Sequence, residues 1–151
     1  SQPLLYWLLN ISIVIVTHGE FGAYLLEAAE EIVGRSSDQC VCVATISRKL
    51  SLIEVRQKIQ AALANAREFA GSDGLLVLCD MLGGTPCNET LMLTRNDSNV
   101  EILAGINLYM LVSALMNARR LGSRALARKV MEDARRSVAN VRELFLSKHQ
   151  A

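Results

Sequence analysis

The sequence predicts an α/β domain, a three-layer sandwich with helices on both faces of a mainly parallel sheet. We expect the strand order 2-1-3-4, with a possible antiparallel strand at one edge. Short apolar runs alternate with longer segments of helical spacing, and the runs are continuously apolar, as in strands buried on both sides. The chain of 151 residues, 51% of them hydrophobic, is long enough to bury one such core. We expect this domain over residues 11–150 and an N-terminal extension over residues 1–10.

Four apolar runs give the predicted strands, which are Ile11–Val16, Cys40–Ile46, Leu75–Cys79 and Val100–Leu103. The first run continues an apolar stretch that begins at Leu4, but Asn10 and Ser12 interrupt this stretch. Because a membrane-spanning helix needs about 20 apolar residues, we expect no insertion into a membrane. We also expect no signal peptide, since no basic residue precedes the stretch.

Segments of helical spacing follow each strand. The predicted helices are Phe21–Val33, Ser51–Phe69, a third that begins at Pro86, Leu108–Arg120 and Arg124–Leu146. Gly34 supplies a C-terminal stop, and Ser51 with Glu54 has the pattern of a capping box. The last helix carries an apolar stripe that must pack on the domain or on a partner, made of Leu126, Val130, Ala134, Val138, Val141 and Phe145.

Charge is balanced overall but not along the chain. The net charge of +1 provides no global field that would drive nucleic-acid binding. Residues 119–148 hold nine basic and three acidic side chains, a net charge of +6, which leaves −5 on the rest. We interpret this basic segment as a solvated helix face, with attraction to an acidic partner as the alternative.

The four cysteines lie at positions 40, 42, 79 and 87, without the paired spacing of a zinc site. We predict reduced thiols, which suits a reducing cytoplasm. Cys42 and Arg48 have the spacing of the phosphate loop in tyrosine-phosphatase-like enzymes, but Cys42 falls inside an apolar run, and a desolvated thiol is inert. We therefore reject that interpretation. Arg48 and Lys49 follow the second strand and are candidates for contact with a phosphate or an acidic partner, an exposed loop pair being the alternative.

Two polar segments follow the first and third strands, at the edge where an open parallel sheet collects its ligands. The first strand runs into Thr17, His18 and Gly19, and the third into the segment from Asp80 to Pro86. The predicted strand order places these strands side by side and therefore predicts contact between His18 and Asp80. A carboxylate that accepts the proton of one ring nitrogen fixes the tautomer and leaves the other nitrogen as a nucleophile.

The turn Gly83, Gly84 and Thr85 opens a predicted helix, where unpaired amides and the helix dipole favour an anion such as a phosphoryl group. Thr85 either adds a hydroxyl donor or caps the helix. Nucleophile, carboxylate and anion cradle together predict phosphoryl transfer through a phosphohistidine, which needs no metal or organic cofactor. Taken separately, a histidine at a strand end is more often structural, and an aspartate before a turn often caps amides.

Three separated motifs strengthen the prediction, namely Thr17-His18-Gly19, Asp80-Met81-Leu82-Gly83-Gly84-Thr85-Pro86 and Ala104-Gly105-Ile106-Asn107. In order and spacing, residues 11–120 resemble the mannose-family enzyme IIA domain of the bacterial phosphoenolpyruvate-dependent sugar phosphotransferase system. The resemblance implies that His18 accepts a phosphoryl group from the phosphocarrier HPr and passes it to an enzyme IIB partner on a separate chain, while Asp80 orients the ring. It also implies a homodimer, in which the family commonly exchanges a C-terminal edge segment.

The chain departs from the family pattern in three places, the first being residues 1–10, which match nothing in the family. No proline follows Asn107, and the residues after Arg120 are more basic than usual.

Two other functions stay open. One is a stand-alone regulatory phosphohistidine domain that is not coupled to sugar transport. The other is a flavodoxin-like or receiver-like module that binds an anion without transferring it, although Thr17 and His18 stand where a receiver needs an acidic pair for magnesium.

Overall fold

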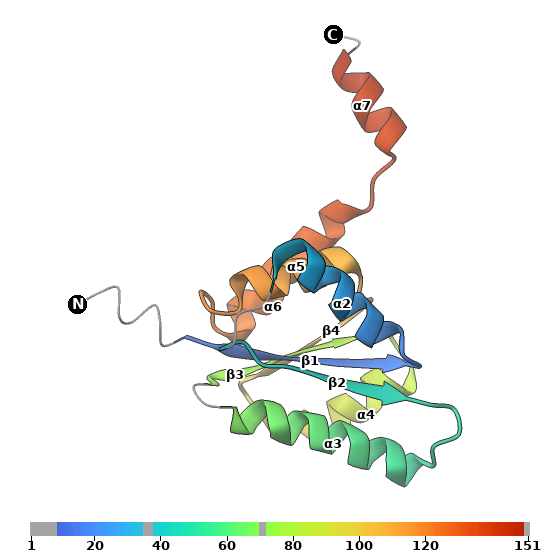
Figure 1. Ribbon diagram of the computed structural model, residues 1–151, viewed down its shortest axis with the longest axis vertical. Helices are drawn as coiled ribbons and strands as arrows, with labels where there is room; N and C mark the ends of the chain where they lie inside the picture. Colours follow the sequence, from blue (N-terminus) through green and yellow to red (C-terminus); the bar gives the residue numbers. More distant parts are fainter. Residues whose placement is uncertain (1–8, 35–37, 70–71, 150–151) are drawn as a thin grey trace, which may run out of the picture.

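The computed structural model describes residues 9–34, 38–69 and 72–149 and contains one four-stranded sheet with helices on both faces (Figure 1). The strands are β1 (Ile11–His18), β2 (Val41–Ile46), β3 (Gly74–Cys79) and β4 (Val100–Ala104). They pair in the order β2-β1-β3-β4, and every pairing is parallel. The predicted fold class and strand order are confirmed, and the described residues contain no antiparallel edge strand. Residues 1–8 of the predicted N-terminal extension lie outside the described residues.

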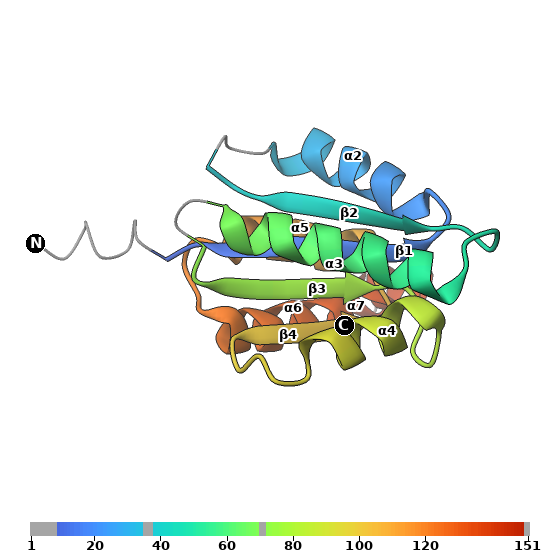
Figure 2. The same cartoon turned by 90° about the horizontal axis from the view of Figure 1, so that it is seen from below.

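The register of the sheet brings the carboxyl ends of its strands to one end of the molecule. His18 pairs with Ile46 of β2, and Val16 pairs with Cys79 of β3. Cys79 in turn pairs with Ala104 of β4. The segments that follow the four strands therefore open at the same end of the sheet, as the arrowheads in Figure 2 show.

The described helices, except for the last one at the C-terminal end, form two layers on the sheet. They are α2 (Phe21–Val33), α3 (Leu52–Glu68), α4 (Thr85–Thr94), α5 (Leu108–Asn117), α6 (Ser123–Ser137) and α7 (Val141–His149). Helices α3 and α4 cover one face of the sheet, and α2, α5 and α6 cover the other (Figures 1 and 2). The capping box of Ser51 and Glu54 is present at the start of α3. Several predicted bounds differ from the structure. Helix α4 begins at Thr85 rather than at Pro86, α5 ends at Asn117 rather than at Arg120, and β1 extends to His18 rather than to Val16.

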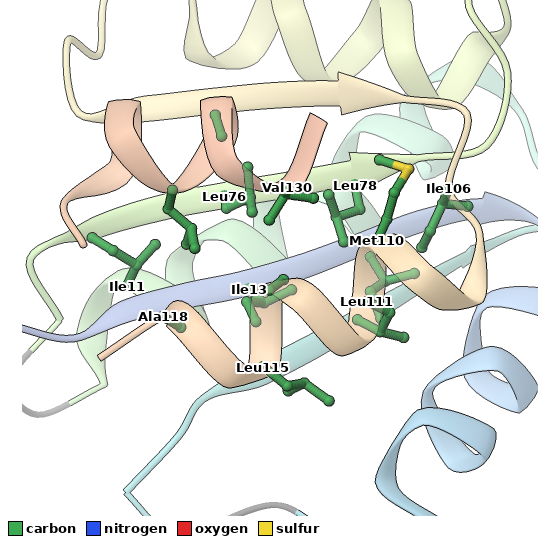
Figure 3. Close-up of a cluster of buried hydrophobic side chains, with 14 of the residues drawn as sticks. Ile11, Ile13, Leu76, Leu78, Ile106, Met110, Leu111, Leu115, Ala118 and Val130 are labelled. Atoms are coloured by element: carbon green, nitrogen blue, oxygen red, sulfur yellow. The ribbon is translucent and has the colours of Figure 1, made fainter. Parts of the chain in front are cut away.

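Each face of the sheet packs its own hydrophobic core. Ile13 and Leu76 face α5 and α6, where they meet Leu111 and the other side chains in Figure 3. Their strand neighbours Val14 and Val77 face α3. Because both faces of β1 are covered, its residues from Ile11 to Thr17 are all buried. This explains why the strand is mostly apolar rather than alternating, with Ser12 and Thr17 as its buried polar residues.

The C-terminal segment differs from the prediction of one helix over Arg124–Leu146. The chain is extended at Val138, and the side chain of Asn140 accepts a hydrogen bond from the Glu143 amide at 3.0 Å, so that a new helix begins. Figure 1 shows this helix, α7, leading away from the sheet. The apolar stripe is therefore divided, with Leu126, Val130 and Ala134 packed in the core and Val138, Val141 and Phe145 exposed.

Two further sequence expectations concern the membrane and the thiols. In the part of the chain that the structure describes, no helix combines the length and the apolar character needed to cross a membrane. No disulfide joins cysteines among the described residues, and Cys42 lies inside β2 rather than at a strand end. The rejected phosphatase-like loop is therefore absent from this position.

Candidate functional site

His18 and Asp80 meet at the shared end of two neighbouring strands, because His18 ends β1 and Asp80 directly follows β3. The ring nitrogen Nδ1 of His18 lies 2.8 Å from Oδ2 of Asp80, and the His18 main-chain amide donates to the same oxygen at 2.8 Å. The Met81 amide donates to Oδ1 at 2.8 Å. The carboxylate is thus held at both oxygens, and the contact predicted from the strand order is present.

The electrostatics of the pair favour an ionised carboxylate beside an accessible ring. Partial burial alone would raise the pKa of Asp80, but hydrogen bonds from the His18 main chain and ring, together with the Met81 amide, lower this pKa below its ordinary value. The side chain of Asp80 is 13% exposed, whereas that of His18 is 51% exposed. An ionised Asp80 favours the tautomer that carries its proton on Nδ1, which leaves a lone pair on Nε2 of His18.

The glycine turn lies against the histidine ring. Gly83 has a φ of +84°, in the left-handed region that glycine tolerates, and Gly84 is the N-cap of α4. A Cβ atom on Gly84 would stand 3.1 Å from Cε1 of His18, so the backbone here approaches the ring more closely than a side chain would allow. The first turn of α4 therefore begins directly beside the imidazole.

Two details of the predicted anion cradle need correction. The Gly84 amide donates to the Met81 carbonyl at 3.0 Å and is therefore occupied. Thr85 is the first helical residue rather than the N-cap, so its hydroxyl does not cap α4. Among the described residues no hydrogen-bond partner is found for the amides of Gly83 and Thr85, so these two groups and the Thr85 hydroxyl are the candidate donors to an anion.

Supporting contacts hold the two loops, and they come from side chains for which the sequence predicted no role. The hydroxyl of buried Thr17 accepts from the Gly22 amide at 3.1 Å and donates to the Gly19 carbonyl at 3.3 Å. The side-chain amide of Asn88 donates to the Gly83 carbonyl at 3.1 Å. Thr17 belongs to the first of the three motifs, but the sequence assigned no role to its hydroxyl, and no pattern pointed to Asn88.

The third motif also contacts the site through the main chain. The Gly105 amide donates to the Asp80 carbonyl at 3.0 Å, and the Ile106 amide donates to the Cys79 carbonyl at 3.0 Å. The side chain of Asn107 accepts from the Met110 amide at 2.9 Å and caps α5. This motif therefore fixes the segment that carries Asp80, and the helix begins without the proline that the family pattern led us to expect.

Arg48 and Lys49 lie in the turn after β2, whose last residue pairs with His18. Both residues are exposed, and no hydrogen bond or ion pair joins either side chain to His18 or Asp80. The structure therefore places them at the same end of the sheet as the site without making them part of it. Among the described residues, no group of three or more His, Cys, Asp or Glu side chains could hold a metal ion.

Fold and site define a parallel α/β domain with an exposed histidine, held by a carboxylate, beside a helix N-terminus. Residues 12–131 match the EIIA-man family, described as the PTS system fructose IIA component, and the chain belongs to this family.

Curated relatives include the PTS system mannose-specific EIIAB component of Escherichia coli K12, which is 33% identical over 109 residues. The match covers 72% of this chain but only 32% of that relative, so the chain spans about a third of its length. The PTS system fructose-specific EIIA component of Bacillus subtilis 168 is 28% identical over 105 residues, which cover 70% of this chain and 68% of the relative.

Solved structures agree in fold. The phosphotransferase system component EIIA from Streptococcus agalactiae is 28% identical, with a TM-score of 0.74 over 86% of this chain and 96% of its own. The PTS IIA protein associated with the fucose utilization operon from Streptococcus pneumoniae has a TM-score of 0.80 over 91% of this chain and 97% of its own. At 23% identity, the second comparison supports the fold alone.

Proposed function

We propose that this chain is the phosphoryl-transfer component of a sugar phosphotransferase system, in which His18 accepts a phosphoryl group from phospho-HPr and passes it to an enzyme IIB partner. The observation that carries the proposal is the 2.8 Å contact between Nδ1 of His18 and Oδ2 of Asp80. It directs the lone pair of the ring to Nε2, beside the first turn of α4. Membership of the EIIA-man family supports the same assignment.

In the proposed reaction Nε2 of His18 attacks the phosphorus atom of the donor. The bond between phosphorus and the donor nitrogen breaks while the bond to Nε2 forms, and the proton on Nδ1 stays hydrogen-bonded to Asp80. Because the phosphorylated ring gains positive charge, the ionised carboxylate stabilises the product. The amides of Gly83 and Thr85, with the Thr85 hydroxyl, stabilise the phosphoryl oxygens. The reverse sequence on an acceptor histidine or cysteine would release the group to the IIB partner.

The surface around His18 suits a protein donor better than a small molecule. Phe21, Met81 and Leu82 expose 45%, 64% and 85% of their area although they are apolar. Exposed apolar side chains around a reactive group favour contact with another protein surface. Arg48 and Lys49 extend this surface as candidate partner contacts. Both HPr and IIB would be met in the cytoplasm, where the cysteines would stay reduced.

A homodimer is part of the proposal. Helix α7 exposes Val141, Leu144 and Phe145 by 75%, 53% and 61%, and β4 forms an edge of the sheet. An exposed apolar stripe and an open strand edge both favour association with a second copy. The mass of the full chain in solution tests this, since truncation after Ser137 should convert a dimer to a monomer.

The test of phosphoryl transfer uses phosphoenolpyruvate, enzyme I and HPr. The wild-type chain should acquire an acid-labile phosphate on His18, the variant His18→Ala should acquire none, and the control His149→Ala should be labelled like wild type. An unlabelled wild type, or a His18→Ala variant that is labelled equally, contradicts the proposal. Addition of purified IIB protein then separates transport from regulation, because a regulatory domain would keep its phosphate.

A further inference from the structure

Cys40 and Cys42 form a dithiol on the edge of the sheet opposite β4. Cys40 directly precedes β2, Cys42 lies within it, and residues two apart in an extended strand project from the same face. Their Sγ atoms are 3.7 Å apart. Both side chains are half-buried and pack against the core beneath α3. The two sulfurs therefore form a preorganised pair that is only partly covered.

A groove of about 400 Å³ runs beside this pair, between β2 and α3. Cys42, Lys58 and Asn65 are among the residues that line it. The Lys58 ammonium donates to the Thr45 carbonyl at 3.1 Å, which keeps a positive charge in the groove. Since β2 is an edge strand, no further strand from the described part of the chain lies on this side of the dithiol.

We propose that the Cys40–Cys42 dithiol is a binding site for a monovalent thiophilic metal ion, with Cu(I) as the best match. Thiolate–metal bonds of about 2.3 Å, the length found for zinc, join sulfurs up to about 4.6 Å apart. The observed 3.7 Å separation therefore needs to open by no more than about 0.9 Å. No third or fourth ligand of the kind that zinc requires stands with the pair among the described residues, whereas Cu(I) accepts two thiolates alone.

Charge and proton balance are consistent with this ion. Each thiol loses its proton to solvent as an S–Cu bond forms, so two protons are released and the complex of Cu(I) with two thiolates carries one negative charge. The Lys58 ammonium lines the same groove, where its printed contact is the Thr45 carbonyl, and it adds a positive charge to this side of the sheet. A disulfide fits less well, because the Cα atoms of residues two apart in a strand are separated by about 6.6 Å, near the upper limit for a disulfide.

Anaerobic titration of the reduced full-length chain with Cu(I), in competition with a colorimetric Cu(I) chelator, tests the site. Wild type should withdraw one equivalent per chain and release two protons. Cys40→Ser and Cys42→Ser should each weaken Cu(I) binding by more than about 100-fold. A substitution of a residue that does not bind the metal itself typically costs only about 10-fold to 100-fold in metal affinity. Cys87→Ser, which removes another half-buried thiol, should bind like wild type.

Failure to compete with the chelator, or equal uptake by Cys40→Ser or Cys42→Ser, overturns the proposal. X-ray absorption of the loaded protein gives a second readout, and any count other than two sulfur ligands would contradict the site. The inference is independent of the proposed phosphoryl transfer, because Cys42 lies four residues from Ile46, the partner of His18 in the sheet. Labelling of His18 in the two serine variants should equal that of wild type, so the two proposals fail separately.

Discussion

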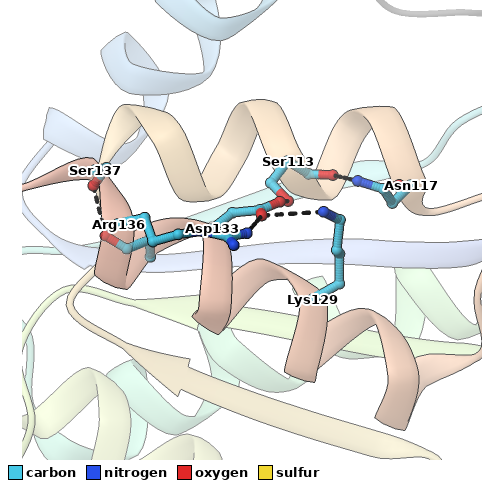
Figure 4. A network of polar contacts seen from close by, with 7 residues as sticks. Ser113, Asn117, Lys129, Asp133, Arg136 and Ser137 are labelled. Atoms are coloured by element: carbon cyan, nitrogen blue, oxygen red, sulfur yellow. Dashed lines mark hydrogen bonds and ion pairs between the residues drawn. The ribbon is translucent and has the colours of Figure 1, made fainter. Parts of the chain in front are cut away.

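Asp80 and Asp133 are two carboxylates with similar surroundings and different consequences. Their side chains are 13% and 14% exposed, and hydrogen bonds lower the pKa of both. Asp133 on α6 accepts from the Ser113 hydroxyl of α5 at 2.6 Å, and it pairs with Lys129 at 3.1 Å and Arg136 at 2.9 Å (Figure 4). Asp80 accepts from the main chain and ring of His18.

The difference lies in what the partners keep after the carboxylate is bound. The cations of Lys129 and Arg136 have no lone pair to offer, and the Ser113 hydroxyl donates its proton to Asp133. The imidazole of His18 keeps a second nitrogen that is free to react. A lowered pKa therefore indicates that the surroundings stabilise the ionised carboxylate. Whether the carboxylate has a structural or a chemical role depends on the group that it binds.

Replacement of Asp80 by asparagine should give the largest effect. In Asp80→Asn the amide can present an N–H group to the ring, which favours the tautomer with its lone pair on Nδ1 rather than on Nε2. The rate of His18 phosphorylation by phospho-HPr should fall by a factor of about 100 to 10,000. Rapid-quench labelling measures this rate. A loss below about threefold would remove the functional distinction between the two aspartates.

A methyl group on Gly84 should affect the same ring from the other side. In Gly84→Ala the new Cβ would lie 3.1 Å from Cε1 of His18 and 3.2 Å from the Met81 carbonyl, so the ring or the turn must move. Displacement at this scale should slow phosphorylation by about 10-fold to 100-fold. Gly122→Ala is the matched control, since Gly122 is also a helix N-cap but a methyl group there would meet no atom within 4 Å. Equal rates in the two variants would contradict the close packing.

The sequence predicted the meeting of His18 and Asp80 because two general rules suffice for it. Continuous apolar runs identify strands buried on both faces, and parallel strands bring their carboxyl ends to one edge. The contact therefore follows from the strand order, although the two residues are far apart in the chain. The capping box of Ser51 and Glu54 was equally predictable, because each partner lies within one helical turn of the other.

Other features depend on contacts that spacing does not encode. The apolar spacing continues through Val138 and Val141, yet the Asn140 side chain offers a helix N-cap that competes with continuation of α6. The occupied Gly84 amide depends on the conformation of the whole turn, including the positive φ of Gly83. The sequence did not predict the contacts of Asp133 with Lys129 and Arg136, because a basic helix face is expected to be solvated. The contact with Ser113 depends on the packing of α5 against α6, which brings the two side chains together.

Removal of Asp133 should reduce stability without affecting phosphorylation. In Asp133→Ala the hydrogen bond from Ser113 and the contacts with Lys129 and Arg136 are lost, and the free energy of unfolding should decrease by about 1 to 2 kcal/mol. Glu132→Ala, at the exposed neighbouring position, should change it by less than about 0.5 kcal/mol. Urea unfolding and the labelling assay together measure both quantities. Slower labelling in Asp133→Ala would mean that the α5–α6 contact supports the site.

The smallest expected effect is the acid dependence of that stability difference. The hydrogen bond from Ser113, with those from Lys129 and Arg136, outweighs burial and lowers the pKa of Asp133 in the folded state, whereas the unfolded chain keeps the ordinary value of about 3.9. The contribution of Asp133 is therefore fully present above about pH 4 and is lost as pH falls through the lower folded-state pKa. Unfolding of wild type and Asp133→Ala between pH 7 and pH 2 should show a constant difference down to about pH 4 and a shrinking one below it. Asp80→Asn should show the same acid dependence, because the pKa of Asp80 is lowered too. A difference that stays constant to pH 2 would assign the stability to packing rather than to the carboxylate charge.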